Sequence, residues 1–227
     1  HKGTEKMQAD IKRRIARLKA EMTKKAKVER RKPVYHVDKE GAGQIALVGP
    51  PNSGKSSLLA VLTAAEPDIA DYPFSTRLPV PGMATYANVA IQLVDLPPLE
   101  ANVTSSWVYG LIKSADALML VLDAGDDDLL GRAESTFELL RANRIHPVSG
   151  APENRHEKKS IIVANKMDLP GSGDRVALLS ELYPGFPVIP VSARSATNLN
   201  ALRRAAFDLL DIIRIYSKPP GKKPDTS

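Results

Sequence analysis

The sequence contains no cysteine and no long hydrophobic run. The first absence excludes disulfide bonds and every metal or redox site that needs a thiolate. The second argues against a membrane-spanning helix, which needs about 18 or more consecutive apolar residues, and no charged-then-apolar leader opens the chain. Since 43% of the 227 residues are hydrophobic and 26% are charged, the composition is that of an ordinary globular domain. Together these features predict a cytoplasmic protein without membrane contact.

Basic charge is concentrated at the N-terminus. Residues 1–32 hold 13 Lys or Arg and 4 Asp or Glu, a net charge of +9, whereas residues 33–227 carry a net charge of −3. The apolar residues of this arm recur at steps of four, three and four, which predicts a basic amphipathic helix. They are Ile11, Ile15, Leu18 and Met22. Such a helix either contacts RNA phosphates or packs its apolar stripe on a protein surface with its charges solvated, and both interpretations stay open.

Residues 33–217 alternate between short apolar runs and helix-length segments. The runs are rich in β-branched residues, as buried parallel strands are. They cover residues 45–48, 89–94, 118–122, 161–164 and 188–191. Helices are expected at 56–65, 129–143, 175–182 and 199–213, and an antiparallel edge strand at 84–87. The alternation predicts an α/β fold with a mostly parallel sheet between two helix layers. Residues 218–227, rich in Pro, Gly and Lys, are expected to form a linker.

The segment from Gly49 to Ser56 reads GPPNSGKS, a complete G-x-x-x-x-G-K-[ST] between an apolar strand and a helix. Glycines at both ends let the backbone wrap a phosphate chain, with N–H groups and the helix N-terminus facing the anion. Lys55 is then expected to bridge the β- and γ-phosphates, and the Ser56 hydroxyl to ligate Mg²⁺. The motif predicts a P-loop NTPase three-layer sandwich. Its expected nucleotide-binding residues are Pro51, Asn52, Ser53, Gly54, Lys55, Ser56 and Ser57.

A second motif, Asn165-Lys-Met-Asp168, follows the apolar run 161–164 and selects the base. Asp168 can accept hydrogen bonds from N1–H and the exocyclic amine of guanine, whereas adenine would leave the carboxylate unpaired. The stem of Lys166 can lie over the base plane, and Asn165 can tie this segment to the phosphate loop. The predicted ligand is therefore GTP or GDP. Residues expected to complete the base-binding wall are Ser192, Ala193 and Arg194.

Two further residues are predicted to belong to a Mg²⁺ site. Asp95 ends the apolar run 89–94, where a doubly wound sheet places a carboxylate that contacts Mg²⁺ through bound water. Thr76 offers a second hydroxyl ligand that reaches the metal only when its loop closes on a γ-phosphate. Lys55 and Thr76 are thus catalytic candidates, and the resemblance given below adds Asn52.

These motifs together resemble the translation-factor-related GTPases, and within them the Obg and developmentally regulated GTP-binding (DRG) branch, over roughly residues 44–218. The resemblance implies a GTPase switch that acts with ribosomes or RNA, and no DNA partner is expected. The end of the chain resembles the entry to a TGS domain, so we expect a truncated protein, and the short 97–164 implies that the branch's inserted helical subdomain is absent. The motifs are GPPNSGKSS (49–57), DYPFSTRLPVPG (71–82), VDLPP (94–98), NKMD (165–168) and VSAR (191–194).

Two residues depart from the broader GTPase pattern. Pro98 stands where an Asp-x-x-Gly motif has a glycine whose N–H senses the γ-phosphate, and proline has no N–H. Leu99 stands where Ras-like GTPases have the Gln that orients water, although an apolar residue is also typical of this branch. Slow intrinsic hydrolysis is therefore expected, with stimulation by a partner or an ion.

The resemblance to potassium-stimulated GTPases makes Asn52 a candidate K⁺ ligand, and the other interpretation is an Asn that stabilises the turn. The sequence thus predicts a slow GTP hydrolase. The alternative is a GTP- or GDP-binding interaction module with little or no hydrolysis.

Overall fold

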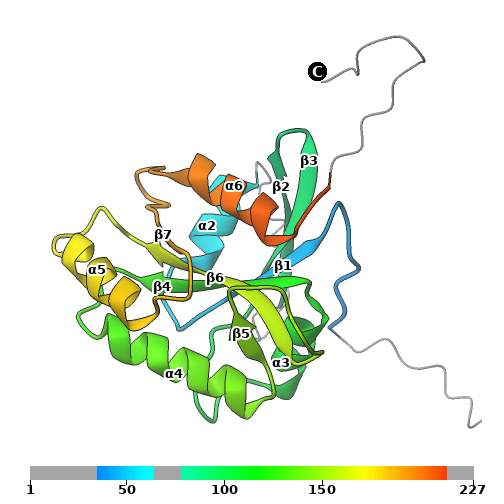
Figure 1. Ribbon diagram of the computed structural model, residues 1–227, viewed down its shortest axis with the longest axis horizontal. Coiled ribbons are helices and arrows are strands. Elements are labelled where there is room, and N and C mark those ends of the chain that lie inside the picture. The colour runs from blue at the N-terminus through cyan, green and yellow to red at the C-terminus, as the bar shows by residue number, and fades with distance from the viewer. Residues whose placement is uncertain (1–34, 64–77, 214–227) are drawn as a thin grey trace, which may run out of the picture. The chain divides into compact units, whose positions relative to one another are not determined.

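The computed structural model describes residues 35–63 and 78–213 of the chain (Figure 1). The chain divides into two units, His1–His36 and Val37–Ser227, and every helix and strand named below belongs to the second. Three predictions fall outside the described residues: the basic helix at 1–32, the metal ligand Thr76 and the linker at 218–227.

In the described part of the chain, seven strands form one sheet in the order β2-β3-β1-β4-β6, with β5 and β7 both paired to β6. The β2–β3 pair is antiparallel and the other pairs are parallel. This confirms the predicted α/β sheet with one antiparallel edge. The strands are β1 (Gln44–Val48), β2 (Val80–Tyr86), β3 (Val89–Asp95), β4 (Ala117–Asp123), β5 (His146–Val148), β6 (Glu157–Asn165) and β7 (Val188–Pro190).

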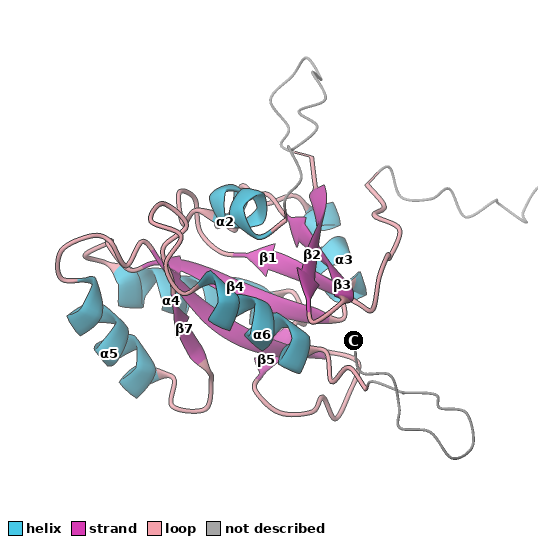
Figure 2. Ribbon diagram, turned by 90° about the horizontal axis from the view of Figure 1, so that it is seen from above, coloured by secondary structure: helices cyan, strands magenta, loops and turns pink. Residues whose placement is uncertain are grey.

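Helices cover both faces of the sheet, so the predicted three layers are confirmed. Helices α2 and α6 lie over one face, and α3 and α4 lie on the other (Figure 1). Seen from above, α6 lies in front of the central strands and runs roughly along them (Figure 2). The helices are α2 (Lys55–Leu62), α3 (Ser106–Ser114), α4 (Leu129–Ala142), α5 (Ser172–Leu182) and α6 (Leu199–Leu209).

The apolar runs form buried strands because both faces of the sheet are covered. All residues of β1 are buried, and Ile45 and Leu47 share a core cluster with Leu58 of α2 and Leu202 of α6. A strand whose two faces are both buried needs apolar residues at consecutive positions rather than at alternate ones. The continuous runs in the sequence follow directly from this requirement.

Four elements differ from the sequence prediction, and one of them is helix α6, which ends at Leu209 rather than at 213. Helix α3 was not predicted, because its sequence SWVYGLIKS has β-branched residues, aromatics and a glycine; packing of Val108 and Ile112 in the core outweighs these weak propensities. Strand β5 has three residues including Pro147, too short to give a periodic signal. Strand β2 begins at Val80 rather than at 84, and it accommodates Pro81 because it is an edge strand.

The parallel arrangement brings four chain segments to one edge of the sheet. In the Cα register, Leu47 near the end of β1 pairs with Asp95 at the end of β3, and Asp123 at the end of β4 pairs with Asn165 at the end of β6. Open α/β sheets bind ligands just outside the carboxyl ends of their strands. The predicted phosphate, metal and base motifs therefore meet at this edge.

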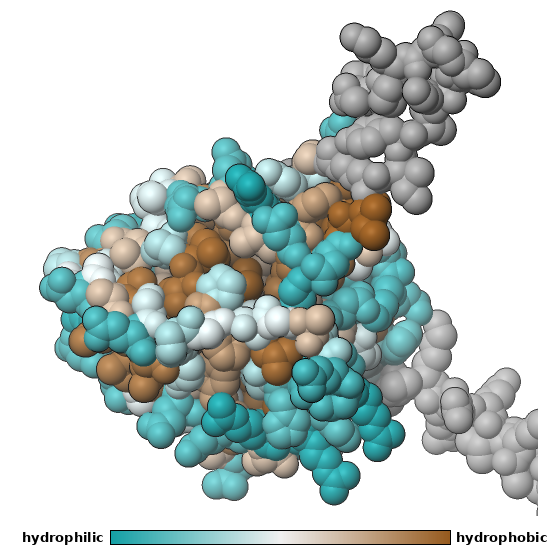
Figure 3. Space-filling view, viewed as in Figure 1, coloured by the Kyte–Doolittle hydropathy of each residue, from teal (hydrophilic) through white to brown (hydrophobic). Residues whose placement is uncertain are grey.

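Length and hydropathy decide whether a helix could cross a membrane in the part of the chain that the structure describes. None of its helices is both long and apolar enough to span a bilayer. On the face shown in Figure 3, hydrophobic residues form separate patches among hydrophilic ones.

Candidate nucleotide-binding site

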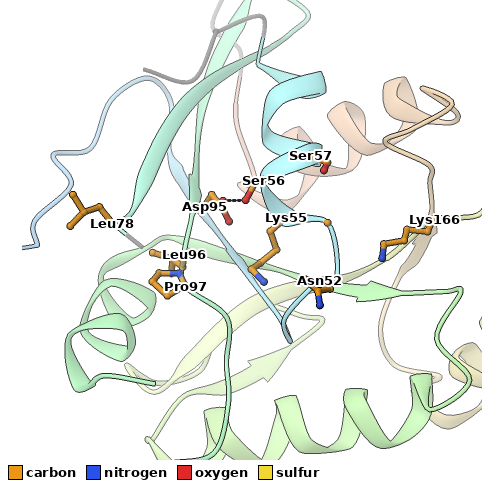
Figure 4. Close-up of a pocket in the computed structure, with 10 residues that line it drawn as sticks. Asn52, Lys55, Ser56, Ser57, Leu78, Asp95, Leu96, Pro97 and Lys166 are labelled. Carbon is orange, nitrogen blue, oxygen red and sulfur yellow. Dashed lines mark hydrogen bonds between the residues drawn. The ribbon is translucent and has the colours of Figure 1, made fainter. Parts of the chain in front are cut away.

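Two adjoining cavities lie at the carboxyl edge of the sheet. The first has a volume of about 360 Å³ and the second about 460 Å³, and they share Gly54, Ser57 and Lys166. Figure 4 shows the first, with Lys55 and Ser56 at the start of α2 and Asp95 beside them. The remaining residues of the first cavity are Asn52, Lys55, Ser56, Leu78, Asp95, Leu96 and Pro97. Those of the second are Asn165, Asp168, Leu169, Ala193 and Arg194.

The phosphate loop has a backbone that requires glycine at both ends. Gly49 has φ +156°, and a Cβ there would lie 2.1 Å from the Val121 carbonyl oxygen. Gly54 has φ +88°, and a Cβ there would lie 2.2 Å from Nδ2 of Asn165. Helix α2 begins at Lys55, directly after Gly54, so its free N–H groups open toward the first cavity. The loop therefore has the geometry of an anion cradle.

The Lys55 side chain lies within this loop and is 7% exposed. Its ammonium donates to the carbonyl oxygens of Gly49 at 3.1 Å and Pro50 at 2.9 Å. Ser53 is fully buried and its hydroxyl donates to the Pro50 oxygen at 3.0 Å. These contacts hold a positive charge beside the first cavity.

Ser56 and Asp95 meet beside the phosphate loop. The Ser56 hydroxyl donates to Oδ2 of Asp95, the dashed contact in Figure 4. Both line the first cavity, so a hydroxyl and a carboxylate present oxygen atoms to the same space. Mg²⁺ takes oxygen ligands and usually keeps several waters beside one or two protein groups and phosphate oxygens. The pair fits such a metal, and the described residues contain no cluster of three or more His, Asp or Glu that would hold a metal alone.

Asn165 links the phosphate loop to the base-binding segments. Its Nδ2 donates to the Ser53 carbonyl oxygen at 3.0 Å, and its Oδ1 accepts from the Ala193 N–H at 3.1 Å. The side chain is 1% exposed. The structure thus contains the tie between NKMD and the phosphate loop that the sequence suggested, across 112 residues of chain.

Asp168 stands exposed at the second cavity. Its Oδ1 accepts a hydrogen bond from the Ser192 hydroxyl at 2.6 Å, and Ser192 in turn accepts from the Ser195 N–H at 3.1 Å. The Ser192 hydrogen bond is the main cause that lowers the pKa of Asp168, with Arg194 and Lys166 adding smaller attractions. Asp168 is therefore an ionised acceptor at neutral pH, as guanine recognition requires.

Sequence reasoning missed contacts that lie outside the motifs. Nζ of Lys166 lies 2.6 Å from Oδ2 of Asp123, the last residue of β4. The Leu99 N–H donates to the Gly49 carbonyl oxygen at 3.0 Å, which fixes the segment after Asp95 against the phosphate loop. The sequence signal that could have suggested the ion pair was an acidic residue, Asp123, at the end of an apolar run. The second contact joins two backbone groups and has no side-chain signal.

The loop that contains Pro98 is held by a threonine. The Thr104 hydroxyl accepts from the Glu100 N–H at 2.8 Å and lies 3.1 Å from the Pro98 carbonyl oxygen. Leu99 is 3% exposed. Its side chain therefore occupies a buried position rather than the solvent-facing place of a water-orienting residue.

Most of the predicted residues that the structure describes line the two cavities, and three do not. Pro51 lines a third cavity of about 630 Å³ together with Leu99 and residues of α4. Ser53 and Ser192 are buried and act on the site through their hydrogen bonds. Thr76 lies outside the described residues.

Known proteins with similar sequences are described as GTPases or G-proteins, in agreement with a nucleotide-binding site. Residues 44–166 match the sequence profile of a family described as 50S ribosome-binding GTPase. Developmentally-regulated G-protein 1 of Arabidopsis thaliana is 26% identical over 287 residues, which cover 99% of this chain and 71% of that protein. GTPase Obg of Corynebacterium urealyticum is 32% identical over 197 residues, which cover 80% of this chain and 38% of Obg. The Arabidopsis alignment is longer than the 227-residue chain, so that protein has residues inside the matched region without a counterpart here.

Solved structures agree with the fold. The G domain of the T. maritima FeoB iron transporter is 28% identical, with a TM-score of 0.53 over 74% of this chain and 98% of that one. Era, solved with MgGDPNP and part of 16S ribosomal RNA, is 25% identical, with a TM-score of 0.56 over 80% of this chain and 60% of that one.

Proposed function

The chain belongs to the 50S ribosome-binding GTPase family and is a P-loop GTP hydrolase, and we propose that it works as a slow, Mg²⁺-dependent molecular switch stimulated by a ribosomal partner or K⁺. The observation that carries this proposal is the pairing of a phosphate cradle with an ionised Asp168 at the adjoining cavity. A module that binds nucleotide with little hydrolysis is not favoured, because the curated relatives are named as GTPases or G-proteins.

The phosphates of GTP would occupy the first cavity and the base the second. Lys55 supplies a positive charge there, and the N-terminus of α2 supplies N–H groups. Charge that develops on the γ-phosphate as water attacks would be stabilised by groups already in place, which is how phosphoryl transfer is accelerated. Lys55 would exchange its contact with the Pro50 carbonyl for a phosphate oxygen, without a large movement of its stem.

Ser56 and Asp95 are the residues that would hold Mg²⁺, with Thr76 proposed as a further ligand. The metal would neutralise negative charge on the β- and γ-phosphates. The structure supports the first two because their oxygens already face one cavity and contact each other. Ser56 would release its hydrogen bond to Asp95 and turn its oxygen lone pair toward the metal.

Slow turnover follows from the loop after Asp95. Neither Pro97 nor Pro98 has an N–H to offer a γ-phosphate, and the Leu99 N–H is bonded to Gly49. A buried Leu99 cannot orient water through its side chain. Stimulation must then add a group from outside this loop, and we propose K⁺ held by Asn52 or an element of a partner.

Asn52 supports the K⁺ proposal by its position. It lines the first cavity and has φ +59°, a left-handed conformation that asparagine tolerates better than most residues. A K⁺ ion bound there would place positive charge beside the phosphates. The same conformation also serves an Asn that only stabilises the turn, so the two interpretations are separated by experiment.

The proposed partner is the ribosome or its RNA. The family description names the 50S subunit, whereas the Era structure contains 16S RNA, so both subunits are relevant probes. The net charge of +9 over residues 1–32 supports a contact with RNA phosphates. A cytoplasmic location is proposed for this protein.

Single-turnover hydrolysis of radiolabelled GTP tests these proposals. Phosphate release is measured in K⁺ and in Na⁺ at matched ionic strength, with and without purified 50S or 30S subunits. We expect slow release with Mg²⁺ alone, faster release with K⁺ or one subunit, and loss of the K⁺ effect in Asn52→Ala. Binding of GTP without phosphate release under every condition would refute the switch, and equal rates in K⁺ and Na⁺ would refute the ion.

A further inference from the structure

Asp123, which belongs to none of the sequence motifs, forms an ion pair with Lys166 beside the proposed base site. Its Oδ2 lies 2.6 Å from Nζ of Lys166, and its Oδ1 accepts from the Gly125 N–H at 2.9 Å. Both carboxylate oxygens therefore have partners. In the sheet register Asp123 pairs with Asn165, the residue directly before Lys166. The fold thus places the carboxylate opposite the start of the NKMD segment.

Lys166 occupies the boundary between the two cavities. It is one of the three residues that line both. Its φ is +67°, so the backbone direction at this point is set by an uncommon left-handed conformation. A lysine side chain is long and flexible, and a fixed end removes most of its freedom. Anchoring the ammonium is what would keep the apolar stem at the cavity boundary.

We propose that Asp123 is a positioning residue for the purine base: it anchors the Lys166 ammonium so that the lysine stem forms a wall of the base cavity. This inference rests on the proposed function, because it assumes that a guanine nucleotide occupies the two cavities. Asp123 lines neither cavity and acts through Lys166. Its effect should therefore appear in binding of the base and not in binding of the phosphates.

Asp123→Asn is the first test, because it keeps the size of the side chain and the acceptor for Gly125 while removing the charge. We measure the affinity for GDP and for inorganic tripolyphosphate, both with Mg²⁺. The side chains of Asp123 and Lys166 are 20% and 33% exposed, so the pair is only partly screened by water. GDP affinity should fall about three- to tenfold through faster dissociation, whereas tripolyphosphate affinity should stay unchanged.

Asp127→Asn is the matched control, since it removes a carboxylate that pairs with Arg175 on the same side of the fold. Its side chain is 93% exposed and GDP affinity should match wild type. Lys166→Met keeps an apolar stem without the ammonium and should lose about as much GDP affinity as Asp123→Asn. The double variant should lose no more than either single variant, because both changes break one interaction.

If Asp123→Asn fails to fold, Lys166→Met still tests the proposal, because a substitution at this partly exposed position is less disruptive to the fold. Wild-type GDP affinity in Asp123→Asn, an equal loss for tripolyphosphate, or additive losses in the double variant would each overturn the positioning role. If wild-type protein bound tripolyphosphate but no GDP, the proposed function itself would be refuted together with this inference. Tight wild-type GDP binding with an unaffected variant would refute the inference alone.

Discussion

Asn165 offers a measurable test of how the site is held together. The side chain makes two buried hydrogen bonds, to the Ser53 carbonyl at 3.0 Å and from the Ala193 N–H at 3.1 Å. Asn165→Ala would leave both backbone groups buried without their partner. An unsatisfied buried polar group costs about 1–3 kcal/mol, so the two together predict a loss of roughly 2–6 kcal/mol in the free energy of unfolding. That is a large share of a typical total of about 5–15 kcal/mol.

Asn165→Asp tests the two hydrogen bonds of this side chain separately, because it keeps one and removes the other. A carboxylate still accepts from the Ala193 N–H, but it places an oxygen against the Ser53 carbonyl oxygen in a buried position. The phosphate-loop side is then repulsive, while the Ala193 side is preserved. We therefore expect GDP affinity to fall in the order wild type, Ala variant, Asp variant.

Urea unfolding of the nucleotide-free protein measures the stability change, and calorimetric titration measures GDP affinity. Asn143→Ala is the control, because its Nδ2 donates to the Leu139 carbonyl oxygen in the last turn of α4 and Asn143 lines neither nucleotide cavity. It should cost about 1 kcal/mol and leave GDP binding unchanged. If Asn165→Ala lost less than about 0.5 kcal/mol and bound GDP normally, the buried-link reasoning would be refuted.

Three further changes test separate parts of the site. Gly49→Ala would place a methyl group 2.1 Å from a carbonyl oxygen of β4. We therefore expect GDP affinity, measured by titration, to fall by at least about 100-fold. Wild-type affinity in this variant would contradict the close packing. Thr104→Val should raise hydrogen exchange at the Leu99 amide by roughly tenfold, while Thr104→Ser retains protection. Ser192→Ala should raise the pKa of Asp168 toward its ordinary value. Because a lowered pKa keeps the carboxylate ionised as pH falls, the acid loss of GDP affinity should begin at a higher pH in this variant, and coincident pH profiles would contradict it.

The sequence predicted those strands and site residues whose signal lies in residues that are adjacent along the chain. Strands such as β1 are buried on both faces and so appear as continuous apolar runs. The phosphate and base motifs follow such strands, and parallel strands bring their carboxyl ends to one edge. The tie from Asn165 to the phosphate loop could be expected for this reason.

Features that depend on tertiary packing alone could not be predicted. Helix α3 forms because Val108 and Ile112 are buried, although its residues have weak helix propensity. The ion pair of Asp123 with Lys166 needs the register of β4 against β6, which no local pattern specifies. The bond from the Leu99 N–H to Gly49 joins backbone atoms and is independent of side-chain type.

That backbone bond gives the two departures at Pro98 and Leu99 a common consequence. After Leu96, two prolines remove two N–H groups, so the Leu99 N–H is the next backbone donor, and it is bonded to the Gly49 carbonyl. The same carbonyl also accepts from Lys55 at 3.1 Å. A γ-phosphate that draws Lys55 away would therefore leave the Leu99 contact in place. We therefore expect the loop after Asp95 to stay on the phosphate loop in both nucleotide states. The response to GTP should then come from the metal ligand proposed at Thr76 and from an external stimulus.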